Sequence, residues 1–170
     1  MGLDQYMFTN SKNLAKKMVE FDKKHHEWLL DECGHSKSGL IGYWRKDNAI
    51  HKFFIDNVQN GVDDQRTSLV QWSMICKLRD ACVKVLETVK YDDDGNPVSI
   101  DADVAEEVLP TQEGFFFGTY GYDERYIYGL EYTRDLINEI EKYITVGEYD
   151  RTYCEDEPDW NVDFYYGCWW

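Results

Sequence analysis

The sequence predicts an α+β fold, a single compact domain with an antiparallel or mixed sheet and about four helices. Its length of 170 residues suits one domain, and 43% hydrophobic with 30% charged residues is typical of a chain that folds around a core. Helical and strand-like patterns are mixed along it without a regular strand–helix–strand rhythm. No linker-like stretch interrupts the sequence, so we expect one domain over residues 1–170.

The first forty positions predict a strand followed by a helix. Residues 1–9 alternate between two unlike faces, as a half-buried strand does. Asn10 or Ser11 can cap a helix that continues to about Cys33, and Gly34 suits its C-terminal end. The apolar stripe of this helix recurs at steps of three and four residues and comprises Leu14, Met18, Phe21, His25 and Trp28.

The middle of the chain predicts two further strand–helix pairs. Residues 40–44 have the aliphatic and aromatic composition of a short strand, and a helix over 48–57 follows it. A second strand at 67–72 precedes a helix that Ser73 would cap. The buried side of that helix is expected to contain Ile75, Leu78, Cys82, Val85, Leu86 and Val89.

The rest of the chain predicts short elements and one long helix. Asp-Gly and Asn-Pro pairs mark a turn at 91–97. The elements expected after it are a brief strand at 98–100, a short helix begun by Asp101 or Asp103 and ending before Pro110, a buried strand at 114–118, a long helix from Asp123 and a strand at 163–170. The apolar stripe of the long helix comprises Ile127, Leu130, Ile137, Ile140 and Ile144.

The net charge of -15 is unevenly distributed. Residues 1–54 hold nine Lys or Arg against seven Asp or Glu, whereas the residues after them hold nine against twenty-six. Such a chain is repelled by the phosphate backbone, which excludes nonspecific binding to duplex DNA. Binding to a basic protein, mimicry of nucleic acid, and a merely solvated surface all remain open. Two blocks dominate, and we expect both to face solvent for the most part: Asp92, Asp93, Asp94, Asp101, Asp103, Glu106 and Glu107, then Glu148, Asp150, Glu155, Asp156, Glu157, Asp159 and Asp163.

Cysteine usage and hydropathy predict an intracellular protein with reduced thiols. The five cysteines form no C-x-x-C pair, and their number is odd. No cationic segment followed by an apolar run opens the sequence, so we expect no signal peptide. No segment approaches the roughly 18 apolar residues of a membrane span.

Residues 42–54, GYWRKDNAIHKFF, gather aromatic and cationic side chains inside an otherwise acidic chain. If a helix begins near Asp47, then Arg45 and Lys46 precede its N-terminus, where unsatisfied backbone N–H groups favour anions. Arginine offers a planar fork for phosphate, and an aromatic ring can stack on a base. We therefore predict a pocket for a nucleotide or another small anion. Its candidate residues are Tyr43, Trp44, Arg45, Lys46, Asn48, His51 and Lys52.

The alternative interpretation of this stretch is structural. Trp44 and Phe53 would then belong to the core, Arg45 and Lys46 would be solvated, and His51 would be a hydrogen-bonded histidine at the boundary of the core. The sequence does not decide between the two interpretations.

A second candidate is the segment after Pro110. Thr111 and Gln112 are small polar residues that can hydrogen-bond the edge of a ligand, and Asp4 and Tyr6 would join them if the first strand lay alongside. The alternative for Thr111 and Gln112 is turn chemistry after the proline.

Motifs for metal binding and catalysis are weak. Cys33 and His35, with His25 and His26 upstream, lack the second ligand pair of a zinc site. The aspartates of the turn at 91–97 lack the ligand spacing of a calcium loop. No serine, cysteine or threonine has a recognisable base partner in the sequence. We therefore expect no metal and no cofactor, and we expect binding rather than catalysis.

Four blocks recur from one end of the chain to the other: MGLDQY at 1–6, the stretch 42–54, LPTQEGFFFG at 109–118 and DFYYGCWW at 163–170. In this order they resemble a family of small, functionally uncharacterised bacteriophage-encoded proteins. Some members bear a phosphoglycerate kinase label, which this sequence does not support because it has no G-x-x-x-x-G-K-[ST] phosphate loop and is too short for a two-domain kinase. The resemblance implies a phage accessory protein and implies no reaction.

Three hypotheses on function follow. The first is a phage accessory protein of the host cytoplasm that counters a host function, a defence pathway above all, by capturing a small anionic or nucleotide-type ligand. The second is an acidic inhibitor or nucleic-acid mimic that binds a host protein directly. The third is a small nucleotide-processing enzyme in which His51 exchanges protons with the substrate.

Overall fold

A four-stranded sheet with the strand order β2-β1-β9-β3 is the centre of the fold. It is formed by β1 (Asp4–Thr9), β2 (Leu40–Arg45), β3 (Ser68–Val70) and β9 (Phe164–Trp169), and every neighbouring pair is antiparallel. This computed structural model describes residues 2–23 and 39–170. The two ends of the chain thus meet in the middle of the sheet, where β1 pairs with β9 along its whole length.

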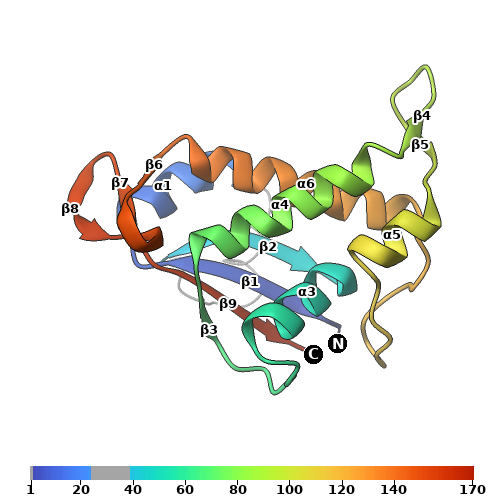
Figure 1. Ribbon diagram of the computed structural model, residues 1–170, viewed down its shortest axis with the longest axis horizontal. Helices are drawn as coiled ribbons and strands as arrows, with labels where there is room; N and C mark the ends of the chain where they lie inside the picture. The colour runs from blue at the N-terminus through green and yellow to red at the C-terminus, as the bar shows by residue number, and fades with distance from the viewer. Residues whose placement is uncertain (1, 24–38) are drawn as a thin grey trace.

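Two small antiparallel sheets lie at opposite ends of the molecule (Figure 1). The hairpin of β4 (Lys90–Tyr91) and β5 (Pro97–Ser99) projects from the body at one end. At the other end, β6 (Ile144–Val146), β7 (Thr152–Cys154) and β8 (Glu157–Asn161) form a three-stranded sheet.

Five α-helices lie within the described residues, so the mixed α+β class predicted from the sequence is confirmed. The helices α4 and α6 pack against each other along one side of the central sheet (Figure 1). Their apolar stripes, which the sequence predicted at three- and four-residue steps, are buried at Ile75, Leu78, Cys82, Leu130 and Ile137. The helices are α1 (Lys12–Phe21), α3 (Asn48–Val58), α4 (Trp72–Leu86), α5 (Ala102–Val108) and α6 (Glu124–Glu141), and a 3-10 turn, η1 (Glu148–Asp150), follows β6.

Three of the predicted helix caps are confirmed and one is wrong. At α3, Asp47 occupies the predicted N-cap position, but its side chain forms no cap hydrogen bond. Ser11, Asp101 and Asp123 each accept a backbone hydrogen bond in the first turn of α1, α5 and α6. Ser73 does not cap α4, because this helix begins one residue earlier, at Trp72. The Asp150 carboxylate, from η1, instead accepts hydrogen bonds from the Ser73 N–H and hydroxyl.

The prediction of a buried strand at 114–118 is wrong. The segment is a turn in which the Phe117 N–H donates to the Gly114 carbonyl, and the Phe115 side chain is 93% exposed. A run of phenylalanines between glycines has the composition of a buried strand, but no described strand pairs with it. Only Phe117 enters the core, where its ring meets the His51 ring edge-on.

The helix predicted to reach Cys33 is described only as far as Phe21, and Asp22 follows as its C-cap residue. The proposed ends of that stripe at His25 and Trp28, and the Cys33–His35 pair, lie outside the described residues. Four cysteines within the described chain carry free thiols, namely Cys76, Cys82, Cys154 and Cys168. A search of the described residues finds no helix with the length and hydropathy to cross a membrane.

Candidate functional site

Tyr43 and Trp44 lie on β2, as predicted, and both side chains are enclosed by the protein. Trp44 is 1% exposed, and its indole N–H donates to the Thr133 hydroxyl of α6 over 2.8 Å. The Tyr43 hydroxyl donates to the Asp4 carboxylate, and burial raises the pKa of Tyr43. Neither ring presents a face on which a base can stack, which for Trp44 agrees with the structural interpretation.

Arg45 and Lys46 separate at the end of β2. The Arg45 side chain is exposed and forms an ion pair with Asp4 at 3.1 Å. Lys46 has a left-handed backbone (φ 60°), which turns the chain into α3, and its side chain lines a small cavity together with Arg125 of α6. The expectation that Trp44, Arg45, Lys46 and His51 line one concave site is therefore wrong. Adjacent residues of a strand point to opposite faces, so Trp44 and Arg45 diverge.

The small cavity lies at the N-terminus of α3, where both sequence candidates meet. The Asn48 side chain donates to the carbonyls of Phe117 and Thr119 over 3.1 and 2.8 Å and accepts from the Gln112 N–H over 3.2 Å. The Thr111 hydroxyl donates to the Tyr120 carbonyl over 2.9 Å. Residues of the stretches 42–54 and 109–118 are thus brought together. The hydrogen bonds between them serve mainly to hold the loop after Pro110 in place.

The volume of this cavity is about 20 Å³. A buried water needs roughly 10–15 Å³, whereas ligand pockets measure about 300–1,000 Å³. Beside the cavity, the Asp47 side chain lies against the backbone of α6 at Gly129, where a Cβ atom would clash with Asp47 Oδ1. The cavity therefore has room for a water or a very small anion but not for a nucleotide.

His51 is fully buried on α3, away from this cavity. Its Nδ1 lies 2.8 Å from the Tyr166 hydroxyl of β9, and its Nε2 lies 2.8 Å from Asp63 Oδ2. Burial lowers the pKa of His51, and the Asp63 carboxylate opposes that shift. Lys52, the next candidate, is separate from this cluster and pairs with Asp56 on the surface at 2.8 Å.

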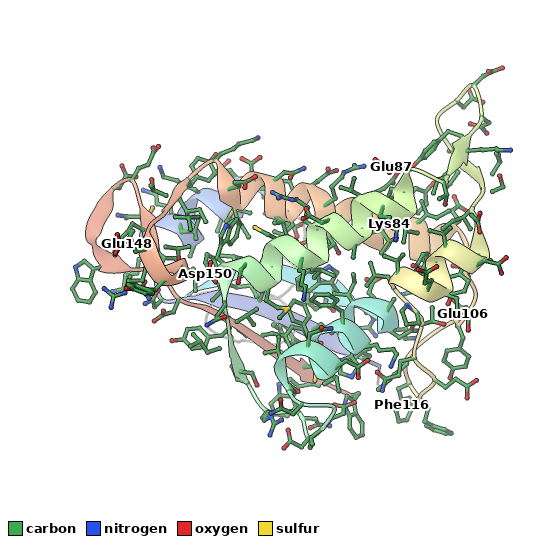
Figure 2. All side chains as sticks on the ribbon, viewed as in Figure 1. Lys84, Glu87, Glu106, Phe116, Glu148 and Asp150 are labelled. Carbon is green, nitrogen blue, oxygen red and sulfur yellow. The ribbon has the colours of Figure 1, made fainter. Side chains whose placement is uncertain are left out.

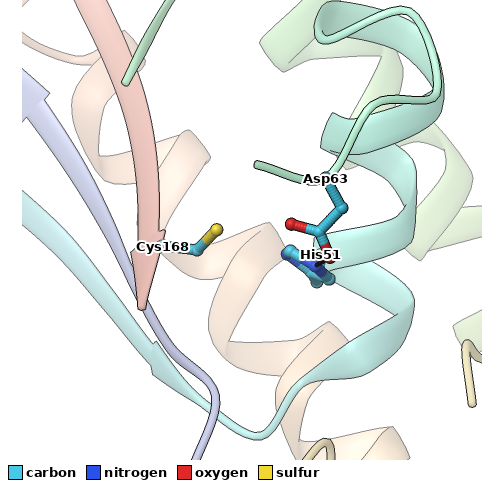
Figure 3. Close-up of side chains that lie close together, drawn as sticks. All are labelled: His51, Asp63 and Cys168. Atoms are coloured by element: carbon cyan, nitrogen blue, oxygen red, sulfur yellow. Dashed lines mark hydrogen bonds and ion pairs between the residues drawn. The ribbon is translucent and has the colours of Figure 1, made fainter. Parts of the chain in front are cut away.

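Cys168 and Asp63 complete a cluster around His51 that the sequence did not reveal (Figure 3). Cys168 follows Tyr166 on the same face of β9, and Asp63 comes from the loop between α3 and β3. One ligand atom from each of the three side chains lies within 4.8 Å of the others. Burial raises the pKa of the Cys168 thiol to about 12, so the free thiol is not a nucleophile near neutral pH.

The acidic blocks of the sequence occupy opposite ends of the molecule. Glu87 and Glu106 lie at the end that carries the β4–β5 hairpin, and Glu148 and Asp150 lie at the end that carries the three-stranded sheet (Figure 2). The prediction that the block 92–107 faces solvent is confirmed, because all seven of its acidic side chains are exposed. In the second block, Glu148, Glu155 and Asp156 are exposed, whereas Asp150 and Asp163 are half-buried.

Comparison with known proteins finds no matching family model, no matching curated protein and no matching solved structure.

Proposed function

We propose that this protein is a phage accessory protein of the host cytoplasm that counters a host function, a defence pathway first of all, by binding a basic host protein. The binding surface in this proposal is the acidic block 92–107 with the hairpin that carries part of it. The observation that supports it is the exposure of all seven carboxylates in that block. No catalytic step is part of the proposal.

Residues 87–107 hold eight acidic side chains and a single lysine, Lys90. Among the described residues, no ion pair involves any of the seven carboxylates of the block 92–107. The potentials of like charges held together on a projecting hairpin and a neighbouring short helix add up, so this end of the molecule has a strongly negative potential. A basic groove, such as one that binds nucleic acid, neutralises this field and is drawn to it over a long range.

Exposed apolar side chains lie in the same region and would supply contact area. Tyr91 and Val98 of the hairpin are 43% and 62% exposed, and Tyr128 of α6 is 44% exposed. The Tyr91 hydroxyl donates to Glu131 of α6 over 2.6 Å, which ties the hairpin to the body. Interfaces are enriched in tyrosine because its ring gives a large contact area at low entropic cost.

Capture of a small anion is the second candidate. Its support is the cavity at the N-terminus of α3, where Lys46 and Arg125 bring positive charge beside Asn48 and Thr111. With a volume of about 20 Å³, this cavity suits an ion smaller than a nucleotide. The enzyme hypothesis has the least support, because His51 is fully buried and both of its ring nitrogens are within hydrogen-bond distance of protein groups.

The test uses two variants of equal charge change. The first variant replaces Asp93, Asp94, Glu106 and Glu107 by their amides and leaves Asp92 and Asp101, which hold a turn and cap α5, in place. The control variant replaces Glu20, Glu113, Glu148 and Glu155, which are exposed elsewhere, by Gln. Immobilised proteins are exposed to host lysate, the retained partner is purified, and its dissociation constant is measured for all three forms.

We expect the first variant to bind the partner roughly tenfold or more weakly, since exposed ion pairs contribute about 0.2–1 kcal/mol each. The control variant should retain most of the affinity. Equal losses in both variants would mean that net charge alone matters and would contradict the proposal. A thermal shift with a nucleotide or an inorganic anion that Arg125→Ala abolishes would favour the second candidate.

A further inference from the structure

The hydrogen-bond chain that ends at His51 has a fixed direction. The Asp47 backbone carbonyl can only accept, so the amide that faces it at 3.0 Å is Gln5 Nε2, and Gln5 Oε1 faces Tyr166. The Tyr166 hydroxyl therefore donates its one proton to Gln5 over 3.0 Å. At His51 the same hydroxyl oxygen must accept, which places a hydrogen on Nδ1.

This direction leaves two acceptors facing each other on the other side of the ring. In a neutral imidazole with Nδ1 protonated, Nε2 presents a lone pair, and it lies 2.8 Å from Asp63 Oδ2. The second oxygen of that carboxylate, Oδ1, already accepts from the Trp170 indole N–H over 3.1 Å. A positive charge between Nε2 and Oδ2, either a shared proton or a metal cation, is what makes this arrangement favourable.

Cys168 distinguishes between these two possibilities. Its sulfur lies within 4.8 Å of both the His51 and the Asp63 ligand atoms, and the residue is fully buried (Figure 3). No hydrogen bond of this sulfur to another described residue is present. A shared proton needs only the histidine and the aspartate, whereas a metal ion uses the thiolate as well.

We propose that His51 Nε2, Asp63 Oδ2 and Cys168 Sγ bind one Zn²⁺, with water as the fourth ligand on the side of Asp63, whose side chain is 18% exposed. Nitrogen, carboxylate oxygen and thiolate are the ligands that Zn²⁺ takes in tetrahedral sites. Bond lengths of about 2.0–2.3 Å place the ligand atoms of such a site roughly 3.3–3.6 Å apart. Reaching that geometry requires Asp63 to withdraw slightly, and Asp63 lies on a loop.

The surroundings of the three ligands are those of a built site. A histidine that binds zinc almost always donates its other ring N–H to a fixed acceptor, and here Tyr166, oriented by Gln5, is that acceptor. The Trp170 indole holds the carboxylate in the same way. The ion would join β9 to α3 and the loop that follows it, which are distant from β9 in the sequence. This inference is independent of the acidic surface.

The experiment uses the full chain without a histidine tag, stripped of metal by a chelator. Titration with Co²⁺ should saturate at one ion per chain and produce the intense visible bands of a tetrahedral ion with a near-ultraviolet thiolate-to-cobalt band. Zn²⁺ should displace the cobalt and raise the melting temperature. X-ray absorption at the zinc edge should then show one sulfur at about 2.3 Å and lighter ligands at about 2.0–2.2 Å.

Variants assign the ligands. Cys168→Ser should abolish the thiolate band. Asp63→Asn should weaken metal binding by about 10–100-fold or more, since losing even a partner that supports a ligand typically costs that much affinity. The matched controls are Cys76→Ser, a half-buried cysteine elsewhere, and Asp64→Asn, in the same loop, and both should bind as the wild type does. Repeating the titration with Cys33→Ser tests the cysteine that the sequence analysis grouped with His25, His26 and His35.

The results that overturn the proposal are equally specific. No stoichiometric binding by the wild type would leave His51 and Asp63 as an internal pair sharing a proton. A thiolate band that persists in Cys168→Ser, or is lost in Cys33→Ser, would place the ion elsewhere. Should a ligand variant fail to fold, the wild-type absorption data still decide, since a zinc ion without one sulfur ligand contradicts the site.

Discussion

The two acidic blocks of this protein have similar composition and different surroundings. In the block 92–107, every carboxylate is exposed and none forms an ion pair with a described residue. In the block 148–163, the carboxylates of Asp150, Asp156 and Asp163 contact the body of the protein. Asp150 binds the first turn of α4, Asp156 pairs with Lys17 at 2.9 Å, and Asp163 donates its N–H to Asn10 and accepts from the Asn10 side chain.

The difference shows that the contacts of an acidic segment with the rest of the protein, and not its charge density, decide whether its carboxylates support the fold. Tyr149 and Asp150 have left-handed backbones (φ 57° and 62°), a conformation that costs energy for residues other than glycine. That conformation directs the Asp150 carboxylate to a helix whose own N-cap, Gln71, forms no side-chain cap. No carboxylate of the first block makes a comparable contact within the described part of the chain, and in the proposed function its charge is available to a partner.

Ionic strength should give the largest difference between the blocks. If the block 92–107 binds a basic partner, raising the salt concentration from 0.1 to 1 M should weaken binding by roughly tenfold or more, because the screening length falls from about 10 to about 3 Å. In the variant with Asp93, Asp94, Glu106 and Glu107 neutralised, the affinity should depend less steeply on the salt concentration. Titration calorimetry at several salt concentrations measures this dependence for the wild type and the variant. An equal dependence in the two proteins would remove the functional distinction between the blocks.

Removing the cap of α4 should give the next largest effect. Asp150→Ala should lower the free energy of unfolding by about 1–2 kcal/mol, as the loss of a helix cap does. Asp150→Asn, which keeps an acceptor oxygen and tolerates the left-handed backbone, should cost less. Urea denaturation of both variants, with Asp93→Asn as the control from the first block, is the measurement.

For that control we expect a change within about 0.5 kcal/mol. A loss for Asp93→Asn as large as that for Asp150→Ala would mean that the first block is also structural.

The smallest effect concerns pH. Hydrogen bonds from Asn96, with those from Asp94 and Gly95, lower the pKa of Asp92 below its ordinary value of 3.8. Because the folded pKa is the lower one, the ionised carboxylate stabilises the turn above pH 3.8, and this contribution is lost as the pH falls through the folded pKa. Asp92→Asn should therefore melt at a lower temperature than Asp93→Asn at pH 7, and the two should converge once the pH falls below the folded pKa of Asp92. A gap independent of pH would contradict the assignment.

Local patterns in the sequence predict much of the fold. The stripe of α6 from Ile127 to Ile140 and its cap Asp123 follow from spacing and from the preference of aspartate for helix N-termini, and both are confirmed. Ile144, predicted as the end of this stripe, lies beyond the helix on β6. The strand prediction at 114–118 is wrong because composition does not show whether a pairing partner exists. Ser73 has the right residue type for a cap of α4, but the actual partner of that helix end, Asp150, is far away in the sequence.

The candidate site is harder to predict than the fold. The alternation of strand side chains, applied to 40–45, sends Trp44 inward and Arg45 outward, and it is sufficient to separate these two residues. Asn48 and Gln112 are both sequence candidates, but their hydrogen bond connects distant segments and has no local signal. The same holds for Asp63 and Cys168, which no spacing rule links to His51.

The position of β9 between β1 and β3 has a consequence for biosynthesis. While the ribosome is still synthesising α6, the strands β1 and β3 have no common neighbour, and the central sheet cannot close. The pairing of Asp4 with Trp169 joins positions near the two ends of the sequence, and such non-local pairings make folding slow. The nascent chain must therefore wait, with an inner strand of its main sheet missing, until residues 164–169 leave the exit tunnel. A translational pause shortly before them would prolong exposure to chaperones and proteases.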